Sequence, residues 1–301
     1  MIRIAAALVA VLCGAGVLPA QLKVVTSTTD LASIAKSVGG SRVTVSHVSE
    51  GYQDPHFAEA KPSFLLRMRD ADVFAFVGLD LEIGWMPLLV DGARNPKIRP
   101  GGTGHVDVSA AIQVLDAQRN ADRSQGDVHP LGNPHYWLDP DNGRKIARLF
   151  DRKFSELAPS RSAEFSKNRQ EFETRLNAAE KGWQDELAVI KGKPVVAFHT
   201  SWKYLAEYTG MKIVGFMEPK PGVPPSPSHL AGLILQIRRT GAKAIIMEPF
   251  YSRKDADFVA SKTGAKVLVL PPSVGAIRGA PVNDYVSLMQ YNLRLLAATL
   301  K

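Results

Sequence analysis

Cysteine is almost absent from this chain of 301 residues, because Cys13 is the only one. Cys13 lies in an amino-terminal segment that we expect to be removed, so the mature chain would contain no thiol. Disulfides, thiolate metal sites and cysteine nucleophiles are then excluded. A tight metal site in such a chain has to be built from histidines and carboxylates.

The amino-terminal segment has the layout of a secretory signal peptide. Arg3 supplies a positive charge, residues 4–17 are almost wholly apolar or small, and Ala20 offers a small residue for cleavage. The residues just before Cys13 lack the small pair that lipid attachment normally requires. We therefore expect a soluble periplasmic or otherwise extracytoplasmic protein without a lipid anchor at Cys13.

The rest of the sequence lacks both long apolar runs and basic clusters. No other segment approaches the roughly 20 apolar residues of a membrane span. The 37 Lys and Arg against 29 Asp and Glu give a net charge of +8, but these positive residues are dispersed along the chain. This pattern indicates a solvated surface and no nucleic-acid partner. Nothing indicates an obligate assembly, so we expect a monomer.

Short β-branched and apolar runs alternate with helical stretches in two separate parts of the chain. This alternation is typical of a parallel sheet flanked by helices. The runs predicted as strands are residues 22–27, 43–48, 71–77, 105–108, 194–198, 212–217, 242–247 and 266–270.

Between the two parts, apolar residues recur at spacings of three, four and seven, and predict one helix from 160 to about 190. The predicted fold class is α/β, with two lobes that each contain a mainly parallel sheet, joined by one long rigid helix. The expected divisions are a signal peptide (1–20), an amino-terminal lobe (21–158), the linking helix (159–191) and a carboxy-terminal lobe (192–301). The polar region 116–133 is expected to be a surface loop.

Three of the seven histidines fall where such sheets place ligands. His56 follows the second predicted strand, His199 closes the strand 194–198, and His135 lies where the polar loop re-enters ordered structure. Ligands of open parallel sheets bind beyond the carboxyl ends of the strands, so these residues can converge between two lobes. Neutral imidazole is a preferred ligand of Zn²⁺.

The same reasoning nominates two carboxylates, because Glu248 and Glu218 each end a predicted strand. The other four histidines have simpler interpretations. Packing or surface roles are expected for His47 and His105, capping or a surface role for His229, and at most a transient metal contact for the loop residue His129.

Three histidine motifs together resemble those of the zinc/manganese-binding solute-binding proteins of ABC importers, cluster A-I. They are Asp54-Pro55-His56, Asn133-Pro134-His135-Tyr136-Trp137-Leu138-Asp139-Pro140 and Phe198-His199-Thr200-Ser201-Trp202-Lys203-Tyr204. The resemblance extends to Glu248-Pro249-Phe250-Tyr251-Ser252 and to the closing helix, in order along the mature chain. It implies a metal held between two lobes and delivery to a membrane permease, with His56, His135 and His199 as nitrogen ligands.

The chain departs from this family pattern at the expected fourth ligand. The resemblance places an Asp just after the last strand, where this sequence has Ser273 and no carboxylate from 268 to 275. Glu248 is our first candidate to replace it, followed by Glu218, Asp54 or a water molecule. A histidine-rich loop, common in zinc-specific relatives, is also missing, since the region 116–133 contains only His129.

The predicted function is capture of a metal ion for an ABC importer, without catalysis. Manganese-type members tend to carry Glu in place of the third histidine, so His199 favours Zn²⁺ over Mn²⁺. The implied partner is an ABC permease in the membrane, and a periplasmic metallochaperone is a conceivable second one. Two alternatives stay open: an exported zinc hydrolase with a three-histidine site, and an adhesin or interaction protein with a structural metal.

Overall fold

The computed structural model describes residues 21–117, 126 and 128–301. The predicted signal peptide (1–20), with Cys13, lies outside the described residues, as does the central part of the predicted polar loop. Within the described part, no helix has both the length and the apolar character needed to cross a membrane.

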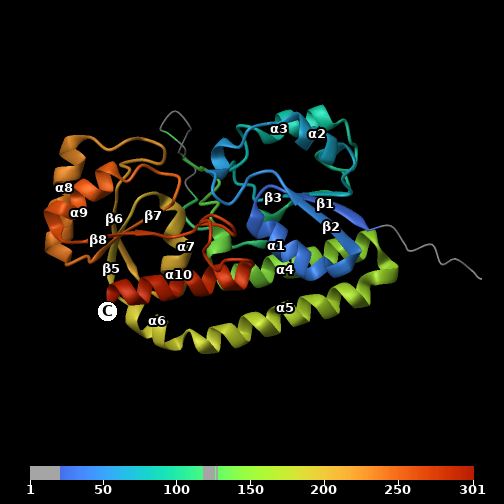
Figure 1. Cartoon of the computed structure of the whole chain (residues 1–301). Coiled ribbons are helices and arrows are strands. Elements are labelled where there is room, and N and C mark those ends of the chain that lie inside the picture. The colour runs from blue at the N-terminus through green and yellow to red at the C-terminus, as the bar shows by residue number, and fades with distance from the viewer. Residues whose placement is uncertain (1–20, 118–125, 127) are drawn as a thin grey trace, which may run out of the picture.

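Two four-stranded parallel sheets form two lobes (Figure 1), as predicted. The strand order is β2-β1-β3-β4 in the first sheet and β6-β5-β7-β8 in the second, so the second lobe repeats the topology of the first. All eight predicted strands are present. They are β1 (Leu22–Thr26), β2 (Val43–His47), β3 (Val73–Phe76), β4 (His105–Asp107), β5 (Pro194–Ala197), β6 (Lys212–Phe216), β7 (Ala244–Met247) and β8 (Lys266–Val269).

Helices cover both faces of each sheet, because successive strand residues point to opposite sides and both sides are apolar. In β1, Val25 packs with α2 and α3, whereas its neighbour Val24 packs with α1 and α4. In β5, Val196 packs with α8 and α9, and Val195 with α7 and α10. These helices are α1 (Thr29–Gly39), α2 (Pro62–Arg69), α3 (Met86–Ala93), α4 (Pro140–Leu157), α7 (Lys203–Thr209), α8 (Pro227–Thr240), α9 (Lys254–Thr263) and α10 (Tyr285–Leu300).

One apolar core is shared by the two lobes. The cluster that contains Val24 of β1 also contains Phe150 of α4, Ala197 of β5 and Leu293 of α10, all of them buried. Movement of one lobe against the other would therefore expose apolar surface, which water disfavours.

The connection between the lobes differs in one respect from the predicted single helix. It consists of α5 (Ser162–Gly182) and α6 (Gln184–Ile190), separated at Trp183. Gly182 is a weak helix former, and the indole of Trp183 is buried in the shared core, so packing outweighs helical continuity here. The two helices still run in succession beneath both sheets (Figure 1).

Candidate metal centre

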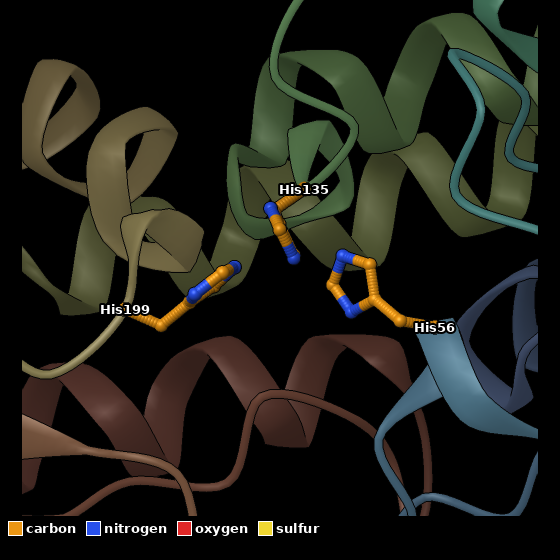
Figure 2. A group of neighbouring side chains, drawn as sticks. All are labelled: His56, His135 and His199. Atoms are coloured by element: carbon orange, nitrogen blue, oxygen red, sulfur yellow. The ribbon is translucent and has the colours of Figure 1, made fainter. Parts of the chain in front are cut away.

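The three histidines selected from the sequence lie together between the lobes. Each of His56, His135 and His199 offers a ring nitrogen, and these nitrogens all lie within 4.8 Å of one another. The side chains are buried, with relative exposures of 8%, 3% and 2%. Figure 2 shows the three rings converging from separate segments of the chain.

His56 is oriented by the residue two positions before it. Asp54 caps the short 3₁₀ turn Pro55–Phe57, and its Oδ1 accepts both the backbone N–H of His56 (3.0 Å) and the ring Nδ1–H (2.6 Å). Burial alone would raise the pKa of Asp54, but the hydrogen bonds from His56 outweigh it and lower the pKa. The ionised carboxylate holds the proton on Nδ1, so Nε2 is available as a ligand.

His135 is oriented in the same way by Asn133. The amide Oδ1 of Asn133 accepts the backbone N–H and the ring Nδ1–H of His135, both at 3.0 Å. The other end of the amide donates to the backbone oxygen of Thr200 (2.9 Å), next to His199. Asn133 therefore ties two ligand-bearing segments together.

His199 follows β5 and is oriented by the neighbouring strand. Parallel pairing continues beyond the two strands, because the N–H of Glu218 donates to the backbone oxygen of Phe198 (3.1 Å). This register places Oε2 of Glu218 2.7 Å from Nδ1 of His199. A carboxylate thus fixes the tautomer of the third ring as well.

Among the three histidines, the surroundings of His135 favour its neutral form. Burial, followed by the nearby rings of His199, His56 and His129, lowers the pKa of His135 well below 6.5. A neutral imidazole presents a lone pair, which is the form that binds metal.

The three candidate carboxylates occupy different places around the cluster. Asp54 and Glu218 contact Nδ1 of their histidines and thus lie on the side of each ring opposite Nε2. Glu248 is fully buried after β7, and burial raises its pKa to about 8, with the charges of Glu218 and Asp54 adding to the effect. Among the described residues, the group of mutually close ligand atoms consists of the three histidines and leaves out both Glu248 and His129.

Comparison with known proteins identifies the family of the chain. The family model described as "ZnuA: Zinc-uptake complex component A periplasmic" matches residues 24–299. The chain belongs to this family. Its resemblance to the metal-binding components of ABC importers is thereby confirmed.

Individual relatives of this ZnuA-family chain are distant. The "Zinc-binding lipoprotein AdcA" of Streptococcus pneumoniae (TIGR4) is 26% identical over 282 residues, which cover 93% of this chain and 56% of the relative. The chain thus spans about half the length of that relative. The "Manganese ABC transporter substrate-binding lipoprotein PsaA" of Streptococcus mitis is 24% identical, with 92% and 88% covered.

Solved structures of similar fold include a "Crystal structure of ZnuA" (TM-score 0.76, 21% identity) and a Mn-bound periplasmic metal-binding protein from Candidatus Liberibacter asiaticus (TM-score 0.77, 22% identity). In both cases the match covers 93% of this chain and all of the other. These matches confirm the two-lobed α/β fold.

The names of the relatives bear on the expected location. AdcA and PsaA are both named lipoproteins, so the expectation that this ZnuA-family chain lacks a lipid anchor has no support. The segment that would carry an anchor lies outside the described residues.

His129, expected from the sequence in a surface loop, lies beside the three-histidine cluster. His129 is buried, with 9% exposure, and its ring centroid lies 5.2 Å from that of His56. No local pattern predicts this, because the two residues are 73 positions apart. The remaining histidines bond elsewhere: His47 to Glu50, His105 to the backbone of Ile98 and His229 to the backbone of Phe216.

Proposed function

We propose that this chain is the extracytoplasmic solute-binding component of an ABC importer, with zinc as its cargo. The observation that carries the proposal is the convergence of three buried imidazoles, each with its Nδ1 held by an oxygen acceptor. Such acceptors fix the tautomer and raise the basicity of a ligating histidine.

The histidine set favours zinc over manganese. Imidazole suits Zn²⁺, whereas Mn²⁺ prefers carboxylate, carbonyl and water oxygens. The two nearest carboxylates, Asp54 and Glu218, are already engaged by Nδ1 atoms. Zinc is therefore the proposed cargo and manganese the weaker competitor, although relatives named for either metal occur.

The proposed role is capture of the ion without chemistry, with ligands drawn from both lobes. His56 follows β2 of the first lobe and His199 follows β5 of the second, so the ion bridges the lobes. The proposed transfer partner is a membrane permease, as the resemblance implies. The fourth position remains a prediction, and Glu248 is its sequence-derived candidate.

Competitive zinc and manganese titration of the purified chain tests this proposal. We expect the wild type to bind zinc in preference to manganese. The variant His199→Ala should lose zinc affinity by at least roughly 10- to 100-fold, since removal of a mere orienting partner already costs that much.

His47→Ala is the matched control, because His47 lies at the end of β2 and bonds Glu50 instead of joining the cluster. A wild type that binds no zinc, or a His199→Ala variant that binds as tightly as the control, would contradict the proposed site.

A further inference from the structure

The ring of His129 lies beside the ring of His56, with their Nε2 atoms in direct contact. The two Nε2 atoms are 3.1 Å apart. Nitrogens bound to one tetrahedral zinc ion at about 2.0–2.1 Å are about 3.3 Å from each other. The observed separation thus matches the edge of a tetrahedral zinc site.

The hydrogen bonds on the far side of the two rings fix their tautomers. Nδ1 of His129 lies 2.9 Å from the backbone oxygen of Leu79, and a carbonyl oxygen can only accept, so this nitrogen carries a proton. Nδ1 of His56 donates to Asp54. In their neutral forms both rings therefore direct Nε2 lone pairs at each other, and a cation between them removes the repulsion.

We propose that His129 supplies a fourth imidazole to the zinc site, so that four neutral nitrogens and no carboxylate hold the ion. This inference rests on the proposed function, because it completes the same site. Ser273 stands where the family resemblance places an Asp ligand. In this proposal His129, from the loop of the first lobe, takes the role of that missing ligand.

An unusual turn of the backbone directs the carbonyl oxygen of Leu79 at His129. Gly78, Leu79 and Asp80 all have positive φ angles (80°, 54° and 65°), which cost free energy in residues other than glycine. The buried carboxylate of Glu82 holds this turn by accepting the N–H groups of Val77 (2.7 Å) and Gly78 (3.0 Å). A strained turn that fixes one acceptor is what an oriented metal ligand requires.

Ligation calls for a small movement of His129. Its ring centroid is 6.4 Å from that of His135, compared with 5.5 Å for His56. A cavity of about 130 Å³ is lined in part by His129, Asn133 and Thr200, so the ring of His129 is not packed tightly on every side.

Glu248 is the competing fourth ligand. Its carboxyl is fully buried, and within the described part of the chain no hydrogen bond joins it to a ring of the three-histidine cluster. The Nε2 atom of His129, by contrast, lies 3.1 Å from that of His56.

Zinc competition titration and the visible spectrum of the Co²⁺-loaded protein test the assignment on the full chain. A four-coordinate cobalt site absorbs far more strongly than a five- or six-coordinate one. We expect His129→Ala to weaken zinc binding by at least roughly 10- to 100-fold and to reduce the cobalt absorption as water enters the shell. His129→Gln keeps an N–H donor for Leu79 but lacks the imidazole, and it should behave like His129→Ala even if the alanine variant folds poorly.

The control is His105→Ala, because the ring of His105 also donates to a backbone oxygen (Ile98, 2.9 Å) but lies outside the cluster. Wild-type affinity and spectrum in both His129 variants would overturn the inference. So would a loss confined to Glu248→Gln, which would assign the fourth position to that carboxyl. A wild type that binds no zinc would instead contradict the proposed function itself. Failure of the His129 assignment and failure of the proposed function are therefore distinguishable.

Discussion

At the scale of single residues, the site depends on oxygen acceptors that hold one nitrogen of each ring. Two of them belong to the same short pattern, an acceptor followed by Pro and His: Asp54-Pro55-His56 and Asn133-Pro134-His135. In both, one oxygen accepts the backbone N–H and the ring Nδ1–H of the histidine. Pro restricts the residue before it to extended conformations, which favours this local hydrogen bonding. The pattern is visible in the sequence and is the signal by which these acceptors can be found.

A buried acid, Asp30, makes stability depend on pH. Asp30 lies at the start of α1, and its Oδ1 accepts the N–H of Val274 from the second lobe (3.1 Å). Burial raises its pKa to about 7, above the ordinary 3.8, and Tyr285 is a neighbouring titratable group. The folded state thus keeps a proton that the unfolded state loses. The stability contributed by Asp30 is present below about pH 4 and is lost as pH rises toward 7.

Asp30→Asn removes this dependence and keeps an oxygen for Val274. The free energy of unfolding of the variant, relative to wild type, should rise by on the order of 1–4 kcal/mol between pH 4 and pH 8. Urea unfolding of the metal-free proteins at a series of pH values measures the difference. Asp257→Asn, on the exposed start of α9, is the control and should follow wild type. Parallel profiles for Asp30→Asn and wild type would refute the assignment.

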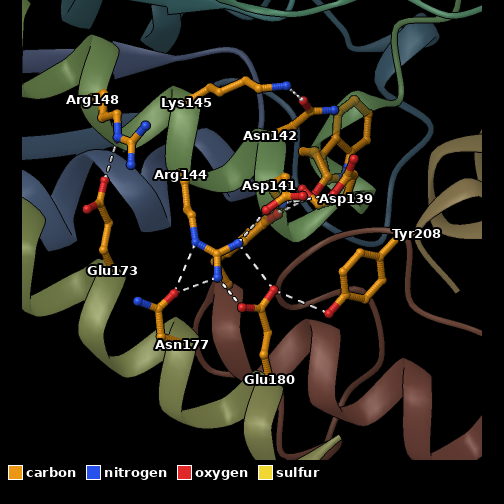
Figure 3. Close-up of polar contacts among 12 residues, drawn as sticks. Asp139, Asp141, Asn142, Arg144, Lys145, Arg148, Glu173, Asn177, Glu180 and Tyr208 are labelled. Atoms are coloured by element: carbon orange, nitrogen blue, oxygen red, sulfur yellow. Dashed lines mark hydrogen bonds and ion pairs between the residues drawn. The ribbon is translucent and has the colours of Figure 1, made fainter. Parts of the chain in front are cut away.

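At the scale of elements, a network of hydrogen bonds and ion pairs connects the helices α4, α5 and α7 (Figure 3). Arg144 of α4 donates to Asp141 (2.7 Å) and to Asn177 of α5 (2.7 Å), and makes an ion pair with Glu180 of α5. Tyr208 of α7 donates to the same Glu180 (3.3 Å). The network therefore connects the helix that follows the His135 segment to a helix of the second lobe.

Arg144→Ala should lower the free energy of unfolding by about 2–4 kcal/mol, because Glu180 and Asn177 lose a planar, charge-assisted partner. The expected cost is below that of a fully buried pair, since about a fifth of the Glu180 side chain is exposed. Lys167→Ala removes an exposed ion pair with Glu171 and should cost about 0–1 kcal/mol. Chemical unfolding of both variants checks this, and equal costs would show that the network adds nothing beyond a surface pair.

The strands and the position of His199 were predictable from the sequence for one physical reason. Both faces of each sheet are covered, so strands appear as apolar runs, and a residue that follows such a run, like His199, must lie at the sheet's carboxyl edge. The break at Trp183 was not predictable, because burial of that indole outweighs the helical periodicity. Nor was the position of His129, which depends on a left-handed turn at Leu79 and on packing between distant segments.

At the scale of the whole molecule, both sheets direct their carboxyl ends toward the same three-histidine cluster while sharing one core. Phe150 of α4, Ala197 of β5 and Leu293 of α10 belong to that core, so opening the lobes widely would expose buried apolar surface. The shared core rather than the linking helices alone limits the hinge. In the proposed function, the ion would add a bridge between lobes that already hold together.

Removal of zinc should therefore leave the fold intact. We expect the radius of gyration of chelated and zinc-loaded protein, measured by X-ray scattering, to differ by less than about 1 Å. Zinc should still raise the melting temperature, because it binds only the folded state and contributes about 2.7 kcal/mol at a hundredfold excess over its Kd. A structural metal would behave differently, since chelation would abolish the near-ultraviolet dichroism of the buried tryptophans. Retention of that signal, together with rebinding of zinc after chelation, is the behaviour that a carrier needs in order to release its cargo and bind again.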